Sequence, residues 1–349
     1  DRVDYSSDTP TMSPKGPLSI KRWLMGATGN ASYGYFGGGT TTSPGQSTVD
    51  RIDYSSDTST ASPKGPLSDA RQNLAATGNA SYGYFGGGQS PSIVTTVDRI
   101  DYSNDTATAA AKGPLTLARQ RPSATGTTDY GYFGGGTNIP KYSTIDRIDY
   151  SNDTPTAVAK GPLSLAREQL AATSNSSYGY FGGGSAGSGG LSIVDRVDYS
   201  NDTATAAAKG PLSVARSAMG GTGSSSYGYF GGGQPGPSSL VDRIDYSNDT
   251  ATAAEKGPLS VARRYVEAVS SRANGLPTVA QSDNQGIISY SDTSGEENDT
   301  TCQFFVNDSG KIKFSGAAGI VTSTSAPTVD TWSHAAVTRT DNTISLYIN

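Results

Sequence analysis

Apolar and charged residues alternate in a short segment that recurs through most of the chain. In one copy, Val197 and Tyr199 fall on the same face of an extended backbone as Ile193. Arg196 and Asp198 fall on the opposite face. This period of two residues predicts a β-strand with one buried side.

The rest of that copy predicts three further segments. Residues 200–203 have short polar side chains that favour a turn, and 204–208 form a small-residue strand that is too short to nucleate a helix. A third apolar segment covers 212–219, and a fourth strand, 226–230, ends in three glycines. Each module of roughly 48 residues therefore carries four short extended segments.

The module repeats along the chain. The phrase Asp-Arg-(Val/Ile)-Asp-Tyr-Ser begins at Asp1, Asp50, Asp98, Asp146, Asp195 and Asp242. The phrase Tyr-Gly-Tyr-Phe-Gly-Gly-Gly, called here the aromatic–glycine phrase, occurs five times, with phenylalanines at Phe36, Phe85, Phe133, Phe181 and Phe230. Most length variation follows the glycines directly, which predicts a surface loop at that point.

Four short strands in each of several adjacent modules are typical of a β-propeller, whose blades cover each other's apolar faces. Six copies of the Asp-Arg phrase predict six four-stranded blades. We expect glycines where a side chain would collide with the next blade, at Gly37, Gly38, Gly86, Gly87, Gly134, Gly135, Gly182, Gly183, Gly231 and Gly232. The recurrent tyrosines expected to pack between blades are Tyr54, Tyr102, Tyr150, Tyr199 and Tyr246.

The order of these features resembles the kelch repeat. Phe230-Gly231-Gly232 matches that family's diglycine, Tyr246 its tyrosine, and Leu259 with Arg263 its Pro-Met-x-x-x-Arg region. The resemblance covers about 1–265 and implies four-stranded propeller blades. The family's tryptophan is replaced in five copies by Met12, Ala109, Ala157, Ala206 and Ala253, so we expect thinner, less aromatic blades.

Ring closure requires strands from both ends of the array. The Asp-x-Tyr strand is third in kelch order, so the final blade would take its inner strands from Leu259–Val279 or Gly286–Tyr290. A seventh blade or an unclosed array is an alternative. Because the sequence starts in mid-pattern at Asp1 and stops within a strand at Asn349, we expect it to be a window of a longer polypeptide.

The composition changes after the array. We expect a connector at 266–283 and a second domain at 284–349, with strands near 286–290, 302–306, 310–314 and 344–348. The Trp-x-His strand at 331–339 and the Leu-Tyr-x-Asn strand at 344–349 resemble the laminin-G/concanavalin-A-like jelly roll. That resemblance implies an incomplete β-sandwich of a kind that often binds glycans, sometimes with calcium. No residue here matches the calcium ligands.

Composition and charge exclude several classes of function. The net charge of −5 disfavours a nucleic-acid backbone binder, and the lack of a long apolar run disfavours membrane insertion. With Cys302 the only cysteine and His334 the only histidine, no internal disulfide, cysteine-based zinc site or two-histidine site is available. We expect no cofactor, no bound metal and no catalytic residue.

Other candidate sites have simpler structural interpretations. His334 and Cys302 are expected to pack in the second domain. Asp146, Asp149 and Asp153 carry oxygen ligands that suit calcium, but turn capping explains them more simply.

Repeated charges and isolated acids are the remaining candidates. Arg147 and Asp149 fit a ligand-binding ring, although exposed cross-strand pairing accounts for them as well. Glu168 and Glu255 are among the few array positions at which a single copy gains an acid, so they are the candidates for a glycan hydrolase or lyase.

The near-identity of the modules favours a structural or binding role. An enzyme site breaks ring symmetry, whereas these copies diverge mainly in loops. The combination of aromatic–glycine repeats and a laminin-G-like segment resembles tail-fibre and virion-surface proteins of bacteriophages, including cyanophages. This implies a non-catalytic adhesion module at the virion surface or outside the cell. Its partners would be a host surface glycan or receptor and other fibre proteins, and a homo-oligomer fits the same role. A propeller glycan hydrolase or lyase and a bacterial extracellular adhesin are the alternatives.

Overall fold

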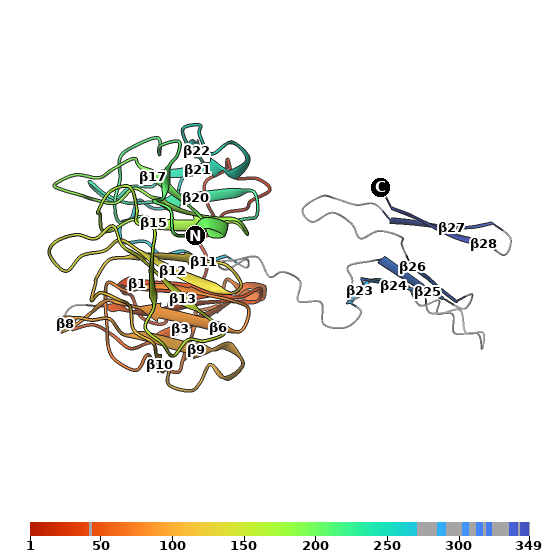
Figure 1. The fold of residues 1–349 in the computed structure, drawn as a ribbon, viewed down its shortest axis with the longest axis horizontal. Helices are drawn as coiled ribbons and strands as arrows, with labels where there is room; N and C mark the ends of the chain where they lie inside the picture. Colours follow the sequence, from red (N-terminus) through yellow and green to blue (C-terminus); the bar gives the residue numbers. More distant parts are fainter. Residues whose placement is uncertain are drawn as a thin grey trace. The chain divides into compact units, whose positions relative to one another are not determined.

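The computed structural model describes residues 1–41 and 44–270, together with six strands between 285 and 348. Its contacts divide the chain into two units, Asp1–Pro277 and Thr278–Asn349. Both units consist of antiparallel strands, which confirms the all-β prediction (Figure 1).

The first unit contains five four-stranded sheets, each a blade of a β-propeller. Blade 1 has β1 (Trp23–Gly29), β2 (Tyr33–Thr40), β3 (Val49–Asp53) and β4 (Ser62–Lys64). Blade 2 has β5 (Ala75–Gly78), β6 (Tyr82–Gly86), β9 (Val97–Asp101) and β10 (Ala110–Lys112). Blade 3 has β11 (Ser123–Gly126), β12 (Tyr130–Gly134), β13 (Ile145–Asp149) and β14 (Val158–Lys160). Blade 4 has β15 (Ala171–Ser174), β16 (Tyr178–Gly182), β17 (Val194–Asp198) and β18 (Ala207–Ala208). Blade 5 has β19 (Gly220–Gly223), β20 (Tyr227–Gly231), β21 (Val241–Asp245) and β22 (Ala254–Lys256).

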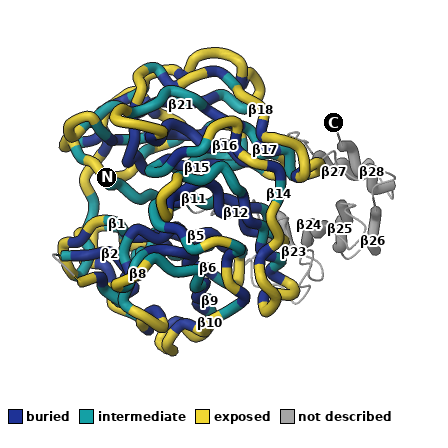
Figure 2. The backbone as a smooth tube through the Cα atoms, turned by 60° about the vertical axis from the view of Figure 1, so that its left-hand side comes forward, coloured by how far each residue is buried: buried dark blue, intermediate teal, exposed yellow. Residues whose placement is uncertain are grey.

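The strands of each blade pair in chain order. The first strands of successive blades contact one another and are therefore innermost. In blade 4, Tyr180 of β16 lies opposite Arg196 of β17, and Phe181 lies opposite Asp195, so the two faces of the sheet alternate as the sequence predicts. The second strands are buried, whereas the turns at the periphery are exposed (Figure 2).

The predicted turn after the third strand is present. It is a short 3₁₀ helix in four copies, at η1 (Tyr54–Ser56), η2 (Tyr102–Asn104), η3 (Tyr199–Asn201) and η4 (Tyr246–Asn248). Asp198 caps η3 by accepting a hydrogen bond of 2.9 Å from the Ser200 amide. A small hairpin, β7 (Gln89–Ser90) and β8 (Ser92–Ile93), lies in the variable loop of blade 2.

One predicted segment is misplaced. Residues 212–219 do not form the strand expected there, because the innermost strand of blade 5 starts at Gly220. The segment instead buries Leu212 and Arg216 and ends with Ala218 in the left-handed region, at φ 55°. This turn redirects the chain into the innermost strand.

The blades pack by placing a phenylalanine ring on a glycine of the preceding blade. A Cβ atom on Gly182 would lie 2.8 Å from the ring of Phe230, which is fully buried. The corresponding distances at Gly37, Gly86 and Gly134 are 2.6–2.8 Å. The next glycine in each phrase has a positive φ, as at Gly183 (62°), so both glycines of the pair are required, for different reasons.

The five positions at which the resemblance predicted thinner blades are buried, and all except Met12 have small side chains. They are Met12, Ala109, Ala157, Ala206 and Ala253. The clusters that contain them combine these residues with three tyrosines and one phenylalanine each, except around Met12, where no phenylalanine is present.

The prediction of six complete blades is wrong: the described residues form five. The sixth place in the ring holds two separate segments. Arg2 bridges to Ser13, as third and fourth strands do, and Tyr265 donates its amide to Ala218, as Ala218 does to Gln169. Residues 266–270 therefore take the place of an innermost strand, within the predicted range 259–279. Within the described residues no second strand accompanies them, and the aromatic–glycine phrase occurs only five times in the sequence.

The second unit contains two sheets. β23 (Gln285–Tyr290), β24 (Cys302–Val306), β25 (Ile312–Gly316) and β26 (Gly319–Thr322) form one, and β27 (Ala335–Thr340) pairs with β28 (Thr343–Ile348) in the other. The predicted segment 286–290 is thus β23, outside the propeller. In the described part of the chain, no helix is long and apolar enough to cross a bilayer.

Replacing Gly182 by alanine should destabilise the propeller by about 1–3 kcal/mol, because the added methyl group overpacks the Phe230 ring. Gly187→Ala is the matched control, since no atom lies within 4 Å of its Cβ position. Urea denaturation of both variants checks the expectation. Equal stability of the two variants would show that the contact between the phenylalanine ring and the glycine does not contribute to the stability of the propeller.

Candidate binding site at the sixth interface

A carboxylate at each complete blade interface is bound by three strands of the preceding blade. Asp249 accepts hydrogen bonds from the Tyr180 hydroxyl at 3.0 Å and from Arg196 at 2.7 Å, and it lies 3.2 Å from the Lys209 ammonium. The same three kinds of donor surround Asp105, Asp153, Asp202 and Asp8.

These contacts set the pKa values at the interface. Burial raises the pKa of Asp249, but hydrogen bonds from Tyr180 and Lys209 and the Arg196 guanidinium outweigh burial and hold that pKa below its ordinary value. The pKa of Tyr180 is raised because the phenol is buried and faces this carboxylate. The cluster therefore consists of a neutral phenol, an ionised aspartate and two cations at neutral pH.

Stacked tyrosines lie beside each carboxylate. The ring of Tyr246 stacks on Tyr180 at 4.8 Å, and its hydroxyl lies 2.7 Å from the Thr173 hydroxyl. Tyr102, Tyr150 and Tyr199 stack in the same way, so four of the five recurrent tyrosines pack between blades.

The repeated arginine has a different role from the one expected. Arg147 was predicted to pair across exposed strands, but it reaches Asp202 of the next blade at 2.7 Å and lies 4.2 Å from the Tyr130 ring centre. It is a structural link between blades. A second recurrent arginine is fully buried inside its blade, as Arg167 is with Asp195 at 2.8 Å.

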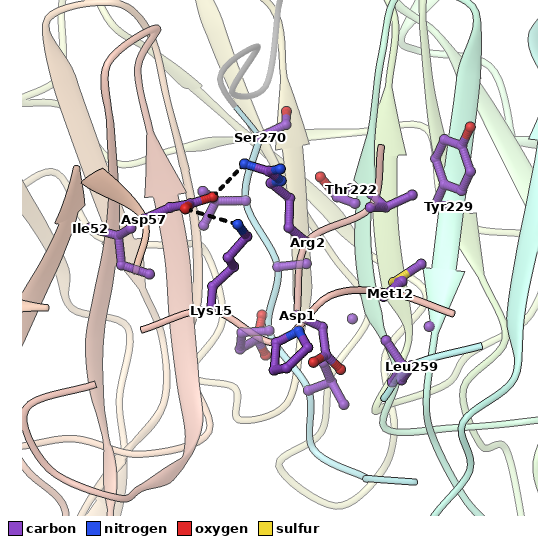
Figure 3. A pocket seen from close by; sticks show the side chains of 18 of the residues that line it. Asp1, Arg2, Met12, Lys15, Ile52, Asp57, Thr222, Tyr229, Leu259 and Ser270 are labelled. Carbon is purple, nitrogen blue, oxygen red and sulfur yellow. Dashed lines mark hydrogen bonds and ion pairs between the residues drawn. The ribbon is translucent and has the colours of Figure 1, made fainter. Parts of the chain in front are cut away.

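The sixth interface encloses a pocket of about 810 Å³, between blade 5 and blade 1. This volume lies within the ~300–1,000 Å³ that small-molecule sites occupy. Figure 3 shows Asp57 on one wall, bound by Arg2 and Lys15, and Tyr229, Met12 and Leu259 on the other.

Asp57 stands where the other five interfaces have their carboxylate. Arg2 donates to it at 2.8 Å and the Lys15 ammonium lies at 3.2 Å, but within the described residues no tyrosine hydroxyl reaches it. The Arg2 side chain is 59% exposed, against 24–25% for Arg243 and its equivalents. Burial raises the pKa of Asp57, but the nearby Lys15 and Arg2 lower it overall.

Tyr54 and Arg263 also lack the surroundings of their counterparts. The Tyr54 hydroxyl donates to the Ser270 carbonyl at 3.2 Å, because Val269 replaces the threonine that the other tyrosines meet. Arg263 pairs with Asp1 at 3.2 Å and is 42% exposed, whereas the equivalent Arg167 is fully buried.

The innermost segment adds one acidic residue to the pocket. Glu267 occupies the position of Ala171 and Gly220, and burial raises the pKa of its carboxyl well above the ordinary value.

The other sequence candidates do not converge on a site. Asp149 caps its own turn, Asp146 pairs with the buried Arg119, and Asp153 belongs to an interface cluster, so the three do not form a calcium site. Glu168 lies 3.3 Å from both Arg121 and Lys141.

The remaining candidates are also separate. Glu255 lies opposite Asp242 on an outer strand, in a different blade from Glu168. His334 lies outside the described residues, and Cys302 is described only as the first residue of β24.

Sequence reasoning missed the pocket residues. Asp57 and Glu267 were not singled out, and Arg263 was identified only as part of the repeated pattern, although a signal existed in the mismatch between six Asp-Arg phrases and five aromatic–glycine phrases. This difference in number indicates that one module lacks the second strand of its blade.

Comparisons with known proteins agree with this architecture. Residues 276–349 match the family described as the concanavalin A-like lectin/glucanases superfamily, which confirms the predicted resemblance of the C-terminal segment. The solved structure of YjhT, a β-propeller, is similar with a TM-score of 0.60 and 11% identity, over 89% of this chain and 99% of that one. At this identity the likeness shows the fold alone. No curated protein matches the chain.

The hydrogen bond from the Tyr180 hydroxyl should make Asp249 contribute more to the stability of the fold than Asp57 does. Asp249→Asn should cost about 2–4 kcal/mol of unfolding free energy at neutral pH, because it leaves two cations and a phenol around a neutral amide. Asp57→Asn, the matched control without a tyrosine, should cost less. Urea denaturation of both variants measures the difference.

The contribution of Asp249 to the free energy of unfolding should decrease as the pH falls. Because folding lowers the pKa of Asp249, its contribution is complete above the unfolded value of ~3.9 and is lost as pH falls through the lowered folded pKa. The stability difference between the native chain and Asp249→Asn should therefore shrink over that acidic range. A difference that stays constant there would contradict the ionised cluster.

Proposed function

We propose that the chain is a non-catalytic adhesion module of a bacteriophage tail fibre or virion surface. The propeller serves as the scaffold, and the C-terminal unit binds host surface glycan. The observation that carries the glycan assignment is the match of residues 276–349 to a family of lectins and glucanases. Association with other fibre proteins and virion-surface or extracellular localisation belong to the same proposal.

The repeated interfaces support a scaffold role for the propeller. The charged groups that recur in every module are bound to one another between or within blades, as Asp249, Arg196 and Lys209 are. Groups held in this way stabilise the ring and are not free to bind substrate. The candidate acids Glu168 and Glu255 lie in separate blades, and Glu168 is held by two cations.

A glycan hydrolase or lyase is the second candidate, because the family that matches residues 276–349 includes glucanases by description. This function would require paired carboxyl groups with a spacing suited to the reaction. The kelch assignment of the repeats remains part of the proposal.

Glycan binding should depend on the C-terminal unit. The full chain should bind a subset of an array of bacterial surface polysaccharides, and a chain that ends at Pro277 should bind none of them. Circular dichroism of the shortened chain controls for loss of the propeller. Retained binding by a folded 1–277 would assign recognition to the propeller instead.

Catalysis should be absent. Incubation with any polysaccharide that binds should release no new reducing ends and no unsaturated product, and Glu168→Gln should bind as the native chain does. Glu255→Gln is the matched control for removal of an isolated acid. Turnover that disappears in Glu168→Gln but persists in Glu255→Gln would establish the enzyme alternative.

A further inference from the structure

We propose that the pocket at the sixth interface is a strand-docking site. Its occupant is an extended Tyr-Gly-Tyr-Phe-Gly-Gly segment, joined ahead of Asp1, that forms the second strand of a sixth blade. This inference rests on the fold and is independent of the glycan-binding proposal.

The backbone on both sides of the pocket has the arrangement that such a strand requires. In blade 4, the second strand β16 pairs with β15 on one side and β17 on the other. At the sixth place, 266–270 and 1–5 hold the positions of those two neighbours, and both line the pocket. Within the described residues no strand lies between them. An extended chain there would pair with both segments, as added strands do at exposed sheet edges.

The polar groups of the pocket match the side chains of the aromatic–glycine phrase. The second tyrosine of the phrase donates to the interface carboxylate in five cases, as Tyr229 does to Asp8 at 2.9 Å. Asp57 is the sixth such carboxylate and has the arginine and lysine partners without the phenol. A docked strand would place a phenol at Asp57 and a ring against Tyr54.

The first tyrosine of the phrase also has a place. In the five complete blades, the ring of this residue lies 4.1–4.3 Å from the guanidinium of the arginine beside it, as Tyr227 does with Arg243. Arg2 is the sixth such arginine and is largely exposed. The docked tyrosine would cover it.

The apolar walls are open where a phenylalanine and a glycine would close them. At Gly231 the nearest atom to an added Cβ is 3.5 Å away, whereas a phenylalanine ring lies at 2.6–2.8 Å from the same position in the other four blades. Phe36 is only partly buried, whereas its four counterparts are fully buried. A docked strand would set its phenylalanine on Gly231 and its first glycine against Phe36.

Arg263 is placed to donate hydrogen bonds to the backbone carbonyls of the docked strand. Arg22 donates to the Phe36 carbonyl at 2.7 Å and to the Gly38 carbonyl at 2.9 Å, both in the second strand of its own blade. Arg263 is the equivalent residue at the sixth place and is 42% exposed. The corresponding carbonyls of a docked strand would lie within its reach.

The order of strands identifies the source of the occupant. In all five complete blades the second strand continues through a loop into the third, and 1–5 stand in the third place. A folded second copy has no such strand to give, because β2, β6, β12, β16 and β20 are each central in a sheet. We therefore commit to a segment that leads into Asp1.

The first test uses a fluorescein-labelled peptide, Ser-Tyr-Gly-Tyr-Phe-Gly-Gly-Gly, with the full chain. It should bind with saturable anisotropy, and Gly231→Ala should abolish binding because the added methyl group occupies the place of the phenylalanine ring. Gly231→Ala has room to fold normally, so its melting temperature should match that of the native chain. Replacing the second tyrosine of the peptide by phenylalanine should weaken binding about tenfold, the loss of one hydrogen bond to a charged group.

The second test joins the same phrase and the ten-residue connection of the first copy, Thr-Thr-Thr-Ser-Pro-Gly-Gln-Ser-Thr-Val (residues 40–49), ahead of Asp1 in the full chain. The fused chain should melt at a higher temperature and should no longer bind the labelled peptide. The same fusion with its phenylalanine replaced by alanine should gain less stability.

Specific outcomes overturn the proposal. Failure of the peptide to bind the folded chain, or equal binding to Gly231→Ala, would show that the pocket does not accept this strand. A fusion that leaves the melting temperature and peptide binding unchanged would overturn the assigned source. Concentration-dependent dimerisation that the peptide competes away would assign the site to a second copy. None of these outcomes depends on glycan binding.

Discussion

The aspartate at the blade interface is the interaction on which the ring depends. Removal of a carboxylate from water costs several kcal/mol unless charges and hydrogen bonds replace the lost hydration. Asp249 obtains that replacement from Tyr180, Arg196 and Lys209, which belong to or directly follow the second, third and fourth strands of the preceding blade. One carboxylate thereby fixes three strands of one blade relative to the turn of the next. The same contacts recur at the interfaces of Asp105, Asp153, Asp202 and Asp8, so each of these interfaces is oriented by the same set of groups.

Apolar packing completes what the carboxylate orients. The phenylalanine ring of each later blade lies on a glycine of the blade before it, with no space for a Cβ atom between them, as Phe230 lies on Gly182. Alanines buried at the same interfaces, such as Ala206 and Ala253, leave room for the blades to pack closely. Small residues and aromatic rings therefore meet across the interfaces between complete blades, and the electrostatic cluster lies beside this buried apolar region.

Features that lie within one module could be predicted from the sequence. The strand of alternating residues, the turn after Tyr199 and the crowded glycine at Gly182 depend on neighbours in sequence or on one module copied beside another. Contacts between different modules could not be assigned in this way. Arg147 and Asp202 are 55 residues apart, and a periodic pattern does not show which copy an arginine reaches. The blade number was wrong for a related reason: the inner strands of a sixth blade were expected from 259–279 or 286–290, but 286–290 belongs to β23 of the second unit.

The sixth interface differs from the other five in whether its recurrent polar groups are all bound. The five stabilise the ring, whereas the sixth has groups that can accept a ligand. Five interfaces bind every recurrent charge, so a ligand there would have to displace a carboxylate from two cations and a phenol. Around the pocket, Asp57 keeps both cations without the phenol on the blade 1 side, and Gly231 of blade 5 keeps an open face without the ring on the other side. The groups around this pocket are therefore already arranged for a strand, and little reorganisation would oppose its entry. Because the modules repeat, the contacts at the five complete interfaces indicate which side chains the pocket at the sixth can accept. Glu267 departs from that pattern, because the equivalent positions carry alanine, serine or glycine, and the repeat does not explain an acid at this position.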